Sequence, residues 1–402
     1  MVSSSSSRQR PLRLAYLVSH PIQYHAPLLR RVAAEPDIEL TVFFQSDLSV
    51  RPFVDPGFGV EIAWDVPLLE GYASEFLPSC GPTDQLTFNQ PRSYGLWPRL
   101  RQGNFDVLWV HGYARACHLK AMVMAKLLGI RVLIRDDAIL ISKPRGPLNH
   151  LFKRALFGAI TPLCQGFLTV GTLNTAYFRH YGVSPRQLFA MAYAVDNDFF
   201  RLAAERARPH RAALRARLGL ACGAPVILFA AKMEPRKRAG DLLAAYAALS
   251  RTPGPMPYLL LAGDGEMRPA LEQQVAALGL DRVRFLGFQG QHQLPPLFDL
   301  ADVFVLPSVS EPWGLVINEV MNASTAVIVS DEVGCAVDLV ENGVNGFILP
   351  AGDCGALTSA LGRVLADPAV SGAIGAASLA RIERWSISAS LQGLRRALGL
   401  ET

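Results

Sequence analysis

The sequence predicts an α/β protein of two domains, each built around a doubly wound parallel sheet. Short β-branched and aromatic runs alternate with helical patterns along the chain, which is typical of repeated strand–helix units. Polar groups gather where these runs end, as they do at the ligand-binding edge of such sheets. The chain has 402 residues, of which 50% are apolar. This length exceeds what a single hydrophobic core usually serves and is enough for two domains.

Each half of the chain contains its own series of elements, after a polar lead-in at residues 1–11 that we expect to be disordered. In the first half, strands are predicted at 12–18, 40–44, 107–110 and 132–134, with a helix at 116–128. In the second half, strands are predicted at 225–231, 258–262, 283–286 and 303–306, with helices at 241–249, 267–278, from 315 onward and at 386–400.

Two carboxylates flank a predicted strand-to-helix turn in the second half. Glu311 lies in the loop, and Glu319 lies inside the following helix. Because a carboxylate only accepts hydrogen bonds, hydroxyl groups of a ribose or a hexose are its natural partners. The unpaired amides near Gly314, Leu315 and Val316, at the start of the helix, suit a phosphate. For an isolated pair, solvated surface acids would be the plainer interpretation.

A basic loop at another predicted strand end strengthens the functional interpretation. Four cations lie between residues 232 and 238. Basic loops usually lie on the solvated surface, but this one follows the carboxyl end of a predicted strand, at the edge of the sheet. We assign Lys232 and Lys237 to a diphosphate, because two cations can also neutralise the charge that grows on a departing nucleotide diphosphate.

Two glycine-containing turns lie between these segments. Gly263 and Gly265 follow a strand and allow close approach of a nucleotide, although Arg268 replaces the third glycine of a dinucleotide fingerprint. Gly287 and Phe288 end the next strand, where their backbone could meet a base edge. Each glycine taken singly is typical of an ordinary turn.

In this order, the segments resemble the retaining glycosyltransferases of family 4, which have the GT-B fold. The whole series is specific, although none of its members is decisive. The resemblance rests on the loop at 232–237, residues 261–265, 283–288 and 301–308, the two glutamates, and residues 338–347.

The resemblance implies two Rossmann-like domains that face an interdomain cleft. It places an acceptor-binding domain at 12–196, a donor-binding domain at 200–380, and a helix at 381–402 that crosses back to the first domain.

The resemblance also implies roles for the residues. Glu319 would bind the ribose of the donor, Glu311 would face its sugar, and the turn at 314–316 would receive phosphate. Lys232 and Lys237 would stabilise the leaving diphosphate. The family more often has arginine at position 232, so Lys232 keeps the charge but loses the bidentate fork.

The loop after the first strand holds candidates for the acceptor side of the cleft. A nicotinamide-dependent enzyme would carry its glycine fingerprint there, and none is present. In the resembling family this loop helps to close the cleft, which makes His20, Gln23, Tyr24 and His25 candidates, although each also suits a turn or a cap.

Later strand ends of the first half hold a second set of candidates. Members of the family often carry a histidine close to the reacting sugar. This chain has Arg135, Asp136 and Asp137 at that position, and His111 ends the preceding strand. Which of them contacts the donor sugar or the acceptor stays open, since a lone histidine at a strand end is more often structural.

Composition narrows the range of partners. A net charge of +5 with 18% charged residues and no basic arm disfavours nucleic acid and fits an anionic substrate or membrane surface. Residues 150–157 combine aromatic and basic side chains that suit peripheral contact with lipid, although an ordinary packing helix is the plainer interpretation. Six cysteines without metal or disulfide spacing, no signal-peptide core and no spanning apolar run predict a cytoplasmic protein, peripheral at most to the inner face of the membrane.

The predicted activity is retaining transfer of a sugar from a UDP- or GDP-linked donor to a hydroxyl acceptor, as in the biosynthesis of glycans, glycolipids or glycosylated metabolites. We expect no cofactor and no metal, because no Asp-x-Asp run ends a strand and Asp136 and Asp137 are adjacent. Two other classes share such a nucleotide site: a GT-B-like epimerase or phosphorylase, and a non-catalytic nucleotide-sugar sensor.

Overall fold

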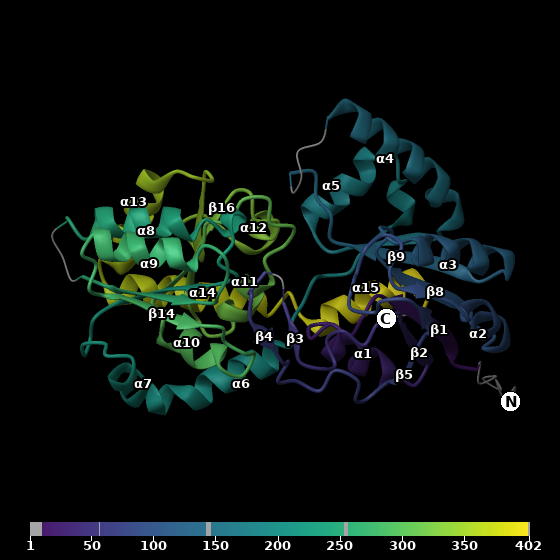
Figure 1. The fold of residues 1–402 in the computed structure, drawn as a ribbon, viewed down its shortest axis with the longest axis horizontal. Helices are drawn as coiled ribbons and strands as arrows, with labels where there is room; N and C mark the ends of the chain where they lie inside the picture. Colours follow the sequence, from purple (N-terminus) through teal and green to yellow (C-terminus); the bar gives the residue numbers. More distant parts are fainter. Residues whose placement is uncertain (1–9, 56, 142–145, 253–255, 401–402) are drawn as a thin grey trace, which may run out of the picture.

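The computed structural model describes residues 10–55, 57–141, 146–252 and 256–400, and it contains two domains that each enclose a parallel sheet (Figure 1). The first sheet has the strand order β11-β10-β9-β8-β1-β2-β5. Its strands are β1 (Leu12–Val18), β2 (Ile38–Phe44), β5 (Ala73–Phe76), β8 (Val107–His111), β9 (Arg131–Asp136), β10 (Gly166–Thr169) and β11 (Leu188–Ala190).

The second sheet has the strand order β14-β13-β12-β15-β16-β17. Its strands are β12 (Val226–Ala230), β13 (Tyr258–Ala262), β14 (Val283–Gly287), β15 (Val303–Leu306), β16 (Ala326–Ser330) and β17 (Gly346–Leu349). Two short antiparallel pairs accompany the first sheet: β3 (Phe53–Val54) with β4 (Glu61–Ile62), and β6 (Ser79–Cys80) with β7 (Arg92–Ser93).

Helices connect the parallel strands and cover the sheets. None of the described helices is both long enough and apolar enough to cross a membrane. The α-helices are α1 (Ala26–Ala33), α2 (Leu96–Gln102), α3 (Ala116–Leu127), α4 (Pro147–Ile160), α5 (Thr172–His180), α6 (Asn197–Ala207), α7 (Arg211–Arg217), α8 (Ala239–Leu249), α9 (Arg268–Ala277), α10 (Leu294–Leu300), α11 (Leu315–Met321), α12 (Ala336–Leu339), α13 (Cys354–Leu365), α14 (Pro368–Ile382) and α15 (Ile387–Leu398). The 3₁₀ turns are η1 (Thr161–Leu163), η2 (Pro185–Gln187), η3 (Arg208–His210) and η4 (Pro235–Lys237).

Burial follows from the parallel pairing. Parallel neighbours need a crossover that lays a helix on the sheet, so both faces become covered. β12, β13 and β16 are accordingly buried at every residue. Four apolar clusters, two in each domain, fill the space between sheets and helices. The predicted α/β class with two doubly wound parallel sheets is therefore confirmed.

The ends of the first domain show contacts beyond its sheet. Residues 1–9 of the predicted lead-in lie outside the described residues, while Arg10 forms an ion pair with Asp106 at 2.7 Å. At the other end, the chain leaves this domain ahead of α6, whose first turn is capped by the side chain of Asp196. The carboxylate of Asp196 accepts from the amide of Phe199 at 3.0 Å.

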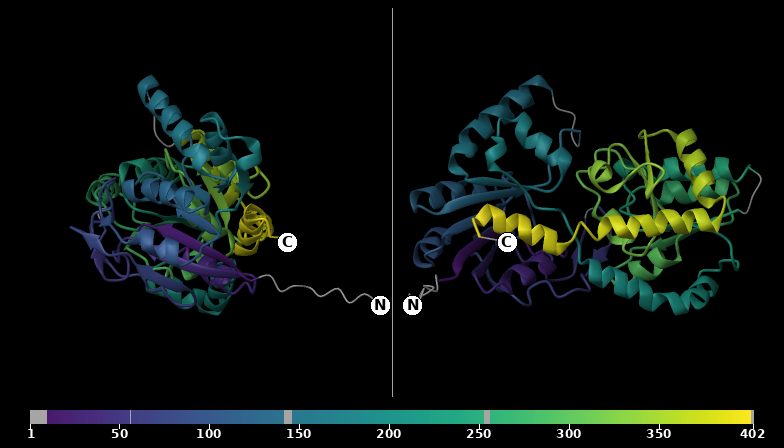
Figure 2. Two further views of the ribbon diagram at one scale, coloured as in Figure 1. Left: turned by 90° about the vertical axis from the view of Figure 1, so that its right-hand side faces the viewer. Right: turned by 180° about the vertical axis from the view of Figure 1, so that it is seen from behind.

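The chain passes between the domains twice, and the two passages touch. The first passage leads into α6, and the second leads from α14 into α15. The side-chain amide of Asn197 donates to the backbone carbonyls of Ile382 (3.1 Å) and Trp385 (3.4 Å). α14 lies along the second domain, and α15 continues from it along the first domain (Figure 2).

The terminal helix α15 packs tightly on the first domain. Leu394 and Leu398 belong to the same apolar cluster as the residues of β1 and β2. Arg395 donates to the carboxylates of Glu35 (2.8 Å) and Asp37 (2.9 Å). Gly393 allows the helix to approach β11, because a Cβ atom there would lie 2.1 Å from the carbonyl oxygen of Ala190.

We expect Gly393→Ala to weaken the packing of α15 on the first domain. The added methyl would collide with backbone, and such overpacking costs about 1–3 kcal/mol of unfolding free energy. Urea unfolding followed by circular dichroism measures the loss. The matched control is Gly372→Ala inside α14, where a Cβ meets no atom within 4 Å and the free energy of unfolding should hold or rise. Equal unfolding of wild type and Gly393→Ala would contradict this packing.

Candidate active site

The candidate site lies where β12 and β15 end side by side. The two strands are parallel neighbours, with Ile227 opposite Val303. Their following loops therefore leave the same edge of the sheet. The loop after β12 carries Lys232 and Lys237, and the loop after β15 carries Glu311.

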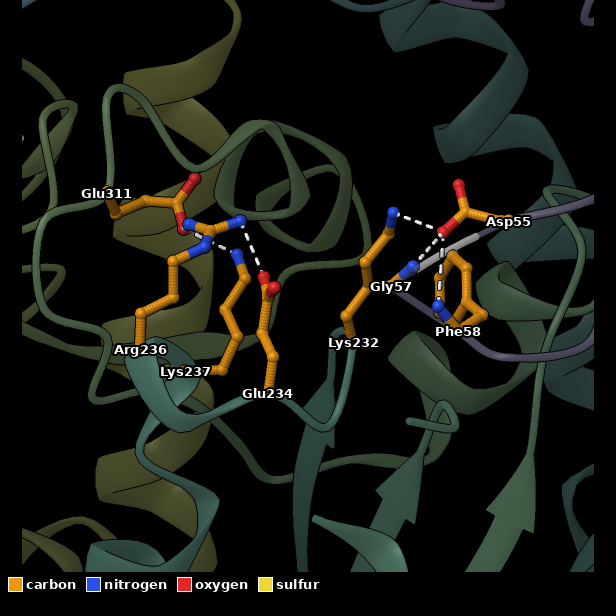
Figure 3. Close-up of polar contacts among 8 residues, drawn as sticks. All are labelled: Asp55, Gly57, Phe58, Lys232, Glu234, Arg236, Lys237 and Glu311. Carbon is orange, nitrogen blue, oxygen red and sulfur yellow. Dashed lines mark hydrogen bonds and ion pairs between the residues drawn. The ribbon is translucent and has the colours of Figure 1, made fainter. Parts of the chain in front are cut away.

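The carboxylate of Glu311 accepts hydrogen bonds from two cations of the basic loop (Figure 3). Arg236 Nη1 lies 2.8 Å from Oε2, and Lys237 Nζ donates to the same oxygen. Arg236 also pairs with Glu234 at 2.7 Å. The side chains of Glu311 and Lys237 are each 11% exposed, so this pair is largely withdrawn from water. Within the described part of the chain, the other carboxylate oxygen of Glu311, Oε1, accepts no hydrogen bond. It is therefore the oxygen that is open to the expected contact with a sugar hydroxyl.

A cavity of about 430 Å³, here named the interdomain cavity, joins these loops to the first domain. It brings together both predicted lysines, both predicted glutamates and the predicted turn at 314–316. Tyr24 and Asp137 of the first domain, and Tyr193 close to its end, also line the cavity. The lining consists of Tyr24, Asp137, Tyr193, Ala230, Ala231, Lys232, Arg236, Lys237, Glu311, Pro312, Trp313, Gly314, Leu315, Val316 and Glu319.

The turn into α11 requires glycine at position 314. Gly314 has φ of 91°, and a Cβ there would lie 3.0 Å from a methyl group of Val333. A residue with a side chain would be strained in this conformation. The turn sets Leu315 and Val316 in the wall of the interdomain cavity.

Glu319 is a buried acid at the cavity wall. The residue is 7% exposed, and burial raises its pKa to about 8. The carboxyl group is therefore mostly protonated at neutral pH, so it can donate as well as accept a hydrogen bond. No group in the described part of the chain is hydrogen-bonded to it, which leaves both functions for a ligand hydroxyl.

Of the three neighbouring candidates Arg135, Asp136 and Asp137, it is Asp137 that lines the interdomain cavity. Burial, and then the charge of Asp136, raise the pKa of Asp137 to about 7. Asp136 instead accepts from the amide of Ala138 at 2.7 Å. Arg135 is 2% exposed, and its guanidinium lies 5.1 Å from the centre of the Tyr193 ring.

The buried His25 and the half-buried His111 lie side by side outside the lining of the interdomain cavity. Their ring centroids are 4.4 Å apart, and Nδ1 of His25 lies 3.2 Å from the hydroxyl of Tyr16. Burial lowers the pKa of both rings well below the usual value, so both are neutral at pH 7. Neither of these two candidate histidines lines the interdomain cavity.

His20, Gln23 and Tyr24 line a second cavity of about 900 Å³, here named the adjacent cavity. Tyr24 and Lys232 belong to the walls of both cavities. Burial, and then the charge of Arg115, lower the pKa of His20 to about 4, so this ring is also neutral at pH 7.

The glycines predicted at the nucleotide lie outside the lining of the interdomain cavity. A Cβ on Gly263 would lie 2.0 Å from the carbonyl oxygen of Ala231. A Cβ on Gly265 would lie 2.7 Å from the carbonyl oxygen of Met233 and 2.9 Å from that of Gly57. Both glycines therefore serve close packing of backbone against backbone.

Aromatic side chains of the first domain cover the end of β14. The ring of Phe288 lies 4.9 Å from that of Phe58 and 6.5 Å from that of Trp64, between centroids. Gly287 bonds to the neighbouring turn, since its carbonyl accepts from the amide of Gly263 at 2.7 Å. The two residues predicted to meet a base edge thus contact protein groups.

Asp55 contacts Lys232 at the cavities and was not predicted from the sequence. Its carboxylate accepts from Lys232 Nζ at 2.6 Å and from the amides of Gly57 (2.8 Å) and Phe58 (3.1 Å) (Figure 3). Burial raises the pKa of Asp55, but Lys232 and the two amides outweigh it and hold the pKa below its usual range. β3 and β4, which flank this residue, have two residues each, so no periodic pattern marks them.

We expect the buried acid Glu319 to make unfolding depend on pH. Its pKa is about 8 in the folded state against 4.5 when exposed, so the folded state holds the extra proton between those values. Stability therefore falls as pH rises from about 4.5 to 8. Glu319→Gln removes this loss, so its melting temperature should gain on wild type from pH 5 to pH 8 and then level off. The control is Glu341→Gln at an exposed position; a pH-independent difference for Glu319→Gln would contradict the assignment.

Comparisons with known proteins point to one family. The family described as "Glycosyl transferases group 1" matches residues 210–379. The D-inositol 3-phosphate glycosyltransferase of Streptomyces scabiei is 28% identical over 417 residues, covering 95% of this chain and 90% of the relative. The alpha-D-kanosaminyltransferase of Streptomyces kanamyceticus is 34% identical over 216 residues, covering 52% of this chain and 54% of the relative.

Solved structures show the same fold. Anabaena Alr3699/HepE in complex with UDP has a TM-score of 0.73 at 19% identity, covering 96% of this chain and all of that one. The sucrose-phosphate synthase of Thermosynechococcus elongatus has a TM-score of 0.71 at 21% identity, covering 96% and 99%. The group 1 match covers the domain that carries the basic loop and both glutamates, so the chain is similar to the group 1 glycosyltransferases and has the GT-B fold.

Proposed function

We propose that this glycosyltransferase moves a sugar from a nucleotide diphosphate sugar to an acceptor hydroxyl with retention of anomeric configuration, as a member of family 4. The observation that carries the proposal is the convergence of Lys232, Lys237, Glu319 and Asp137 on one interdomain cavity. Two cations suit a diphosphate, and two acids suit the hydroxyl groups of the ribose and the sugar on either side of it.

The lysines would act on the leaving group. The bond between the anomeric carbon and the diphosphate oxygen breaks, and its electron pair leaves with the nucleotide diphosphate. Lys232 and Lys237 stabilise the charge that grows there, helped by the amides of Leu315 and Val316. The acceptor oxygen bonds to the anomeric carbon on the face that the diphosphate leaves, and its proton passes to the leaving phosphate.

We propose that transfer needs no metal ion. A metal in such reactions neutralises diphosphate charge, and here Lys232 and Lys237 already line the cavity to do so. Asp137 is proposed to contact the transferred sugar from the first domain, in place of the histidine common in the resembling family, because it lines the cavity beside Tyr24. Arg135 and His111, which lie outside the lining, would support it.

A UDP-linked sugar is the first donor to test, with GDP-linked sugars second. Structural relatives support this order, since Anabaena Alr3699/HepE was solved with UDP and with UDP-glucose. The domains would divide the work, with residues 12–196 holding the acceptor and residues 200–380 the donor. Glu319, which lines the cavity from the second domain, would then form hydrogen bonds with the hydroxyl groups of the ribose.

We also propose that the protein is cytoplasmic and rests peripherally on the inner face of the membrane through α4. Leu148, Leu151 and Phe152 of this helix are 81%, 65% and 69% exposed, while Phe157 is buried. The helix thus combines a packed end with an exposed apolar stretch beside the exposed Arg154, while Lys153 donates inward to the hydroxyls of Tyr113 and Tyr177.

Removal of the Lys232 charge should slow transfer. We expect Lys232→Ala to lower kcat by about 10²–10³-fold, because one group that stabilises the leaving charge is lost. Lys232→Arg should retain most activity, since the charge remains. Product formation from UDP- and GDP-sugars, with slow donor hydrolysis as a second readout, provides the measurement. Lys126→Ala on α3 is the matched control, and undiminished transfer by Lys232→Ala would refute the assignment.

The same reaction tests retention and the absence of a metal requirement. Proton NMR of the product should show the anomeric configuration of the donor, and excess chelator should leave the rate unchanged. Inversion, or loss of transfer that added Mg²⁺ or Mn²⁺ restores, would overturn the respective proposal. Donor turnover without any acceptor product would favour an epimerase or phosphorylase, and donor binding without turnover would favour a sensor.

The membrane proposal predicts binding to anionic lipid. The protein should co-sediment with phosphatidylglycerol vesicles more than with phosphatidylcholine vesicles, and Leu151→Ser with Phe152→Ser should reduce that binding at least several-fold. The control is Val370→Ser in the second domain, where another exposed apolar side chain is removed. Equal sedimentation of the double variant and wild type would exclude α4 as the contact.

A further inference from the structure

We propose that the adjacent cavity is the acceptor subsite, and that it accepts an uncharged or amine-bearing polyol and disfavours a phosphorylated one. This inference rests on the proposed function and specifies the acceptor that the enzyme uses. The position of the adjacent cavity, its aromatic side chains and its charge each support the proposal.

The adjacent cavity opens beside the reacting end of the donor site. Lys232, assigned to the leaving diphosphate, and Tyr24 line both cavities. A hydroxyl group held in the adjacent cavity therefore lies next to the bond that breaks. The volume of about 900 Å³ is within the range of small-molecule sites and suits a sugar or a cyclitol with substituents.

The lining of the adjacent cavity is rich in aromatic side chains. Phe53, Phe58 and Trp64 contribute rings to its lining. Phe58 is also fixed in place, since its amide donates to Asp55 and its ring packs against Phe288. Flat aromatic faces with a few polar groups beside them suit the apolar face of a sugar ring, whose hydroxyl groups project from its rim.

The charge of the adjacent cavity opposes an anion. Asp55 and Asp84 are its acids, and Lys232 is the lysine or arginine that the structure places in the lining. Lys232 is already bound to Asp55 at 2.6 Å. His20 adds no positive charge at pH 7, because burial keeps its ring neutral.

Donor binding would make the adjacent cavity more negative. Lys232 turns to the diphosphate under the proposed mechanism, while the amides of Gly57 and Phe58 continue to hold Asp55 in the wall. Asp55 and Asp84 then face the acceptor without a compensating cation in the lining. Carboxylates bind hydroxyl and ammonium groups and repel a phosphate.

The test compares matched acceptors with the purified full chain. Glucose, glucosamine and glucose 6-phosphate, and inositol, an aminocyclitol and inositol phosphate, are each offered with the donor that the enzyme hydrolyses. We expect kcat/KM for a neutral or amine-bearing member to exceed that of its phosphorylated counterpart at least tenfold. Asp84→Lys, at an exposed loop position, should narrow that ratio at least fivefold, and Glu70→Lys outside the lining should leave it unchanged.

The outcomes separate this inference from the proposed function. Equal or better use of a phosphorylated acceptor, or an unchanged ratio in Asp84→Lys, overturns the inference. Measurable donor hydrolysis without transfer to any neutral or amine-bearing member overturns it as well. If no nucleotide sugar is hydrolysed or transferred at all, the proposed function fails, and the inference fails with it.

Discussion

The parallel pairing of β12 with β15 is the constraint on which the candidate site depends. Two loops that are far apart in the sequence leave the sheet at one edge, so a basic loop and an acidic loop come into contact. The ion pair between Lys237 and Glu311 then holds them together with little water around it. Removing Glu311 would leave the buried Lys237 beside Arg236 without its carboxylate, whereas Glu311 would keep Arg236 if Lys237 were removed, so the basic loop depends on Glu311 most.

Both lysines that are proposed to act on the diphosphate are paired with protein carboxylates. Lys237 lies on Glu311, and Lys232 lies on Asp55 of the other domain. A bound diphosphate would therefore replace one anionic partner by another instead of meeting bare cations. The side chain of Lys237 is 11% exposed and that of Lys232 is 32% exposed, so folding has removed more water from Lys237 than from Lys232.

Positions after buried strands were predictable from the sequence, because a strand of apolar residues fixes where its loop emerges. Lys232, Lys237 and Glu319 follow such runs, and all three line the interdomain cavity. The contact of Asp55 with Lys232 was not predictable, because it joins residues 177 apart and its local strands are too short to show a period. The sequence also left open which of the acids at 136 and 137 faces the cavity.

Glycine patterns were ambiguous for a different physical reason. A glycine that lets a nucleotide approach and a glycine that lets another backbone approach look the same in a sequence. Gly263 and Gly265 were predicted for the nucleotide and are packed against carbonyl groups in the structure. Gly314 was correctly predicted at the turn into a helix, because strand, turn and apolar helix face follow one another directly there.

The contact between the two passages of the chain has a mechanical consequence. Because Asn197 ties the first passage to Ile382 and Trp385 in the second, the domains are joined at one place by two segments. Two segments held at one point permit rotation about that point and resist separation. Rotation of the domains about Asn197 would have to separate Lys232 from Asp55, an ion pair that joins the two domains elsewhere.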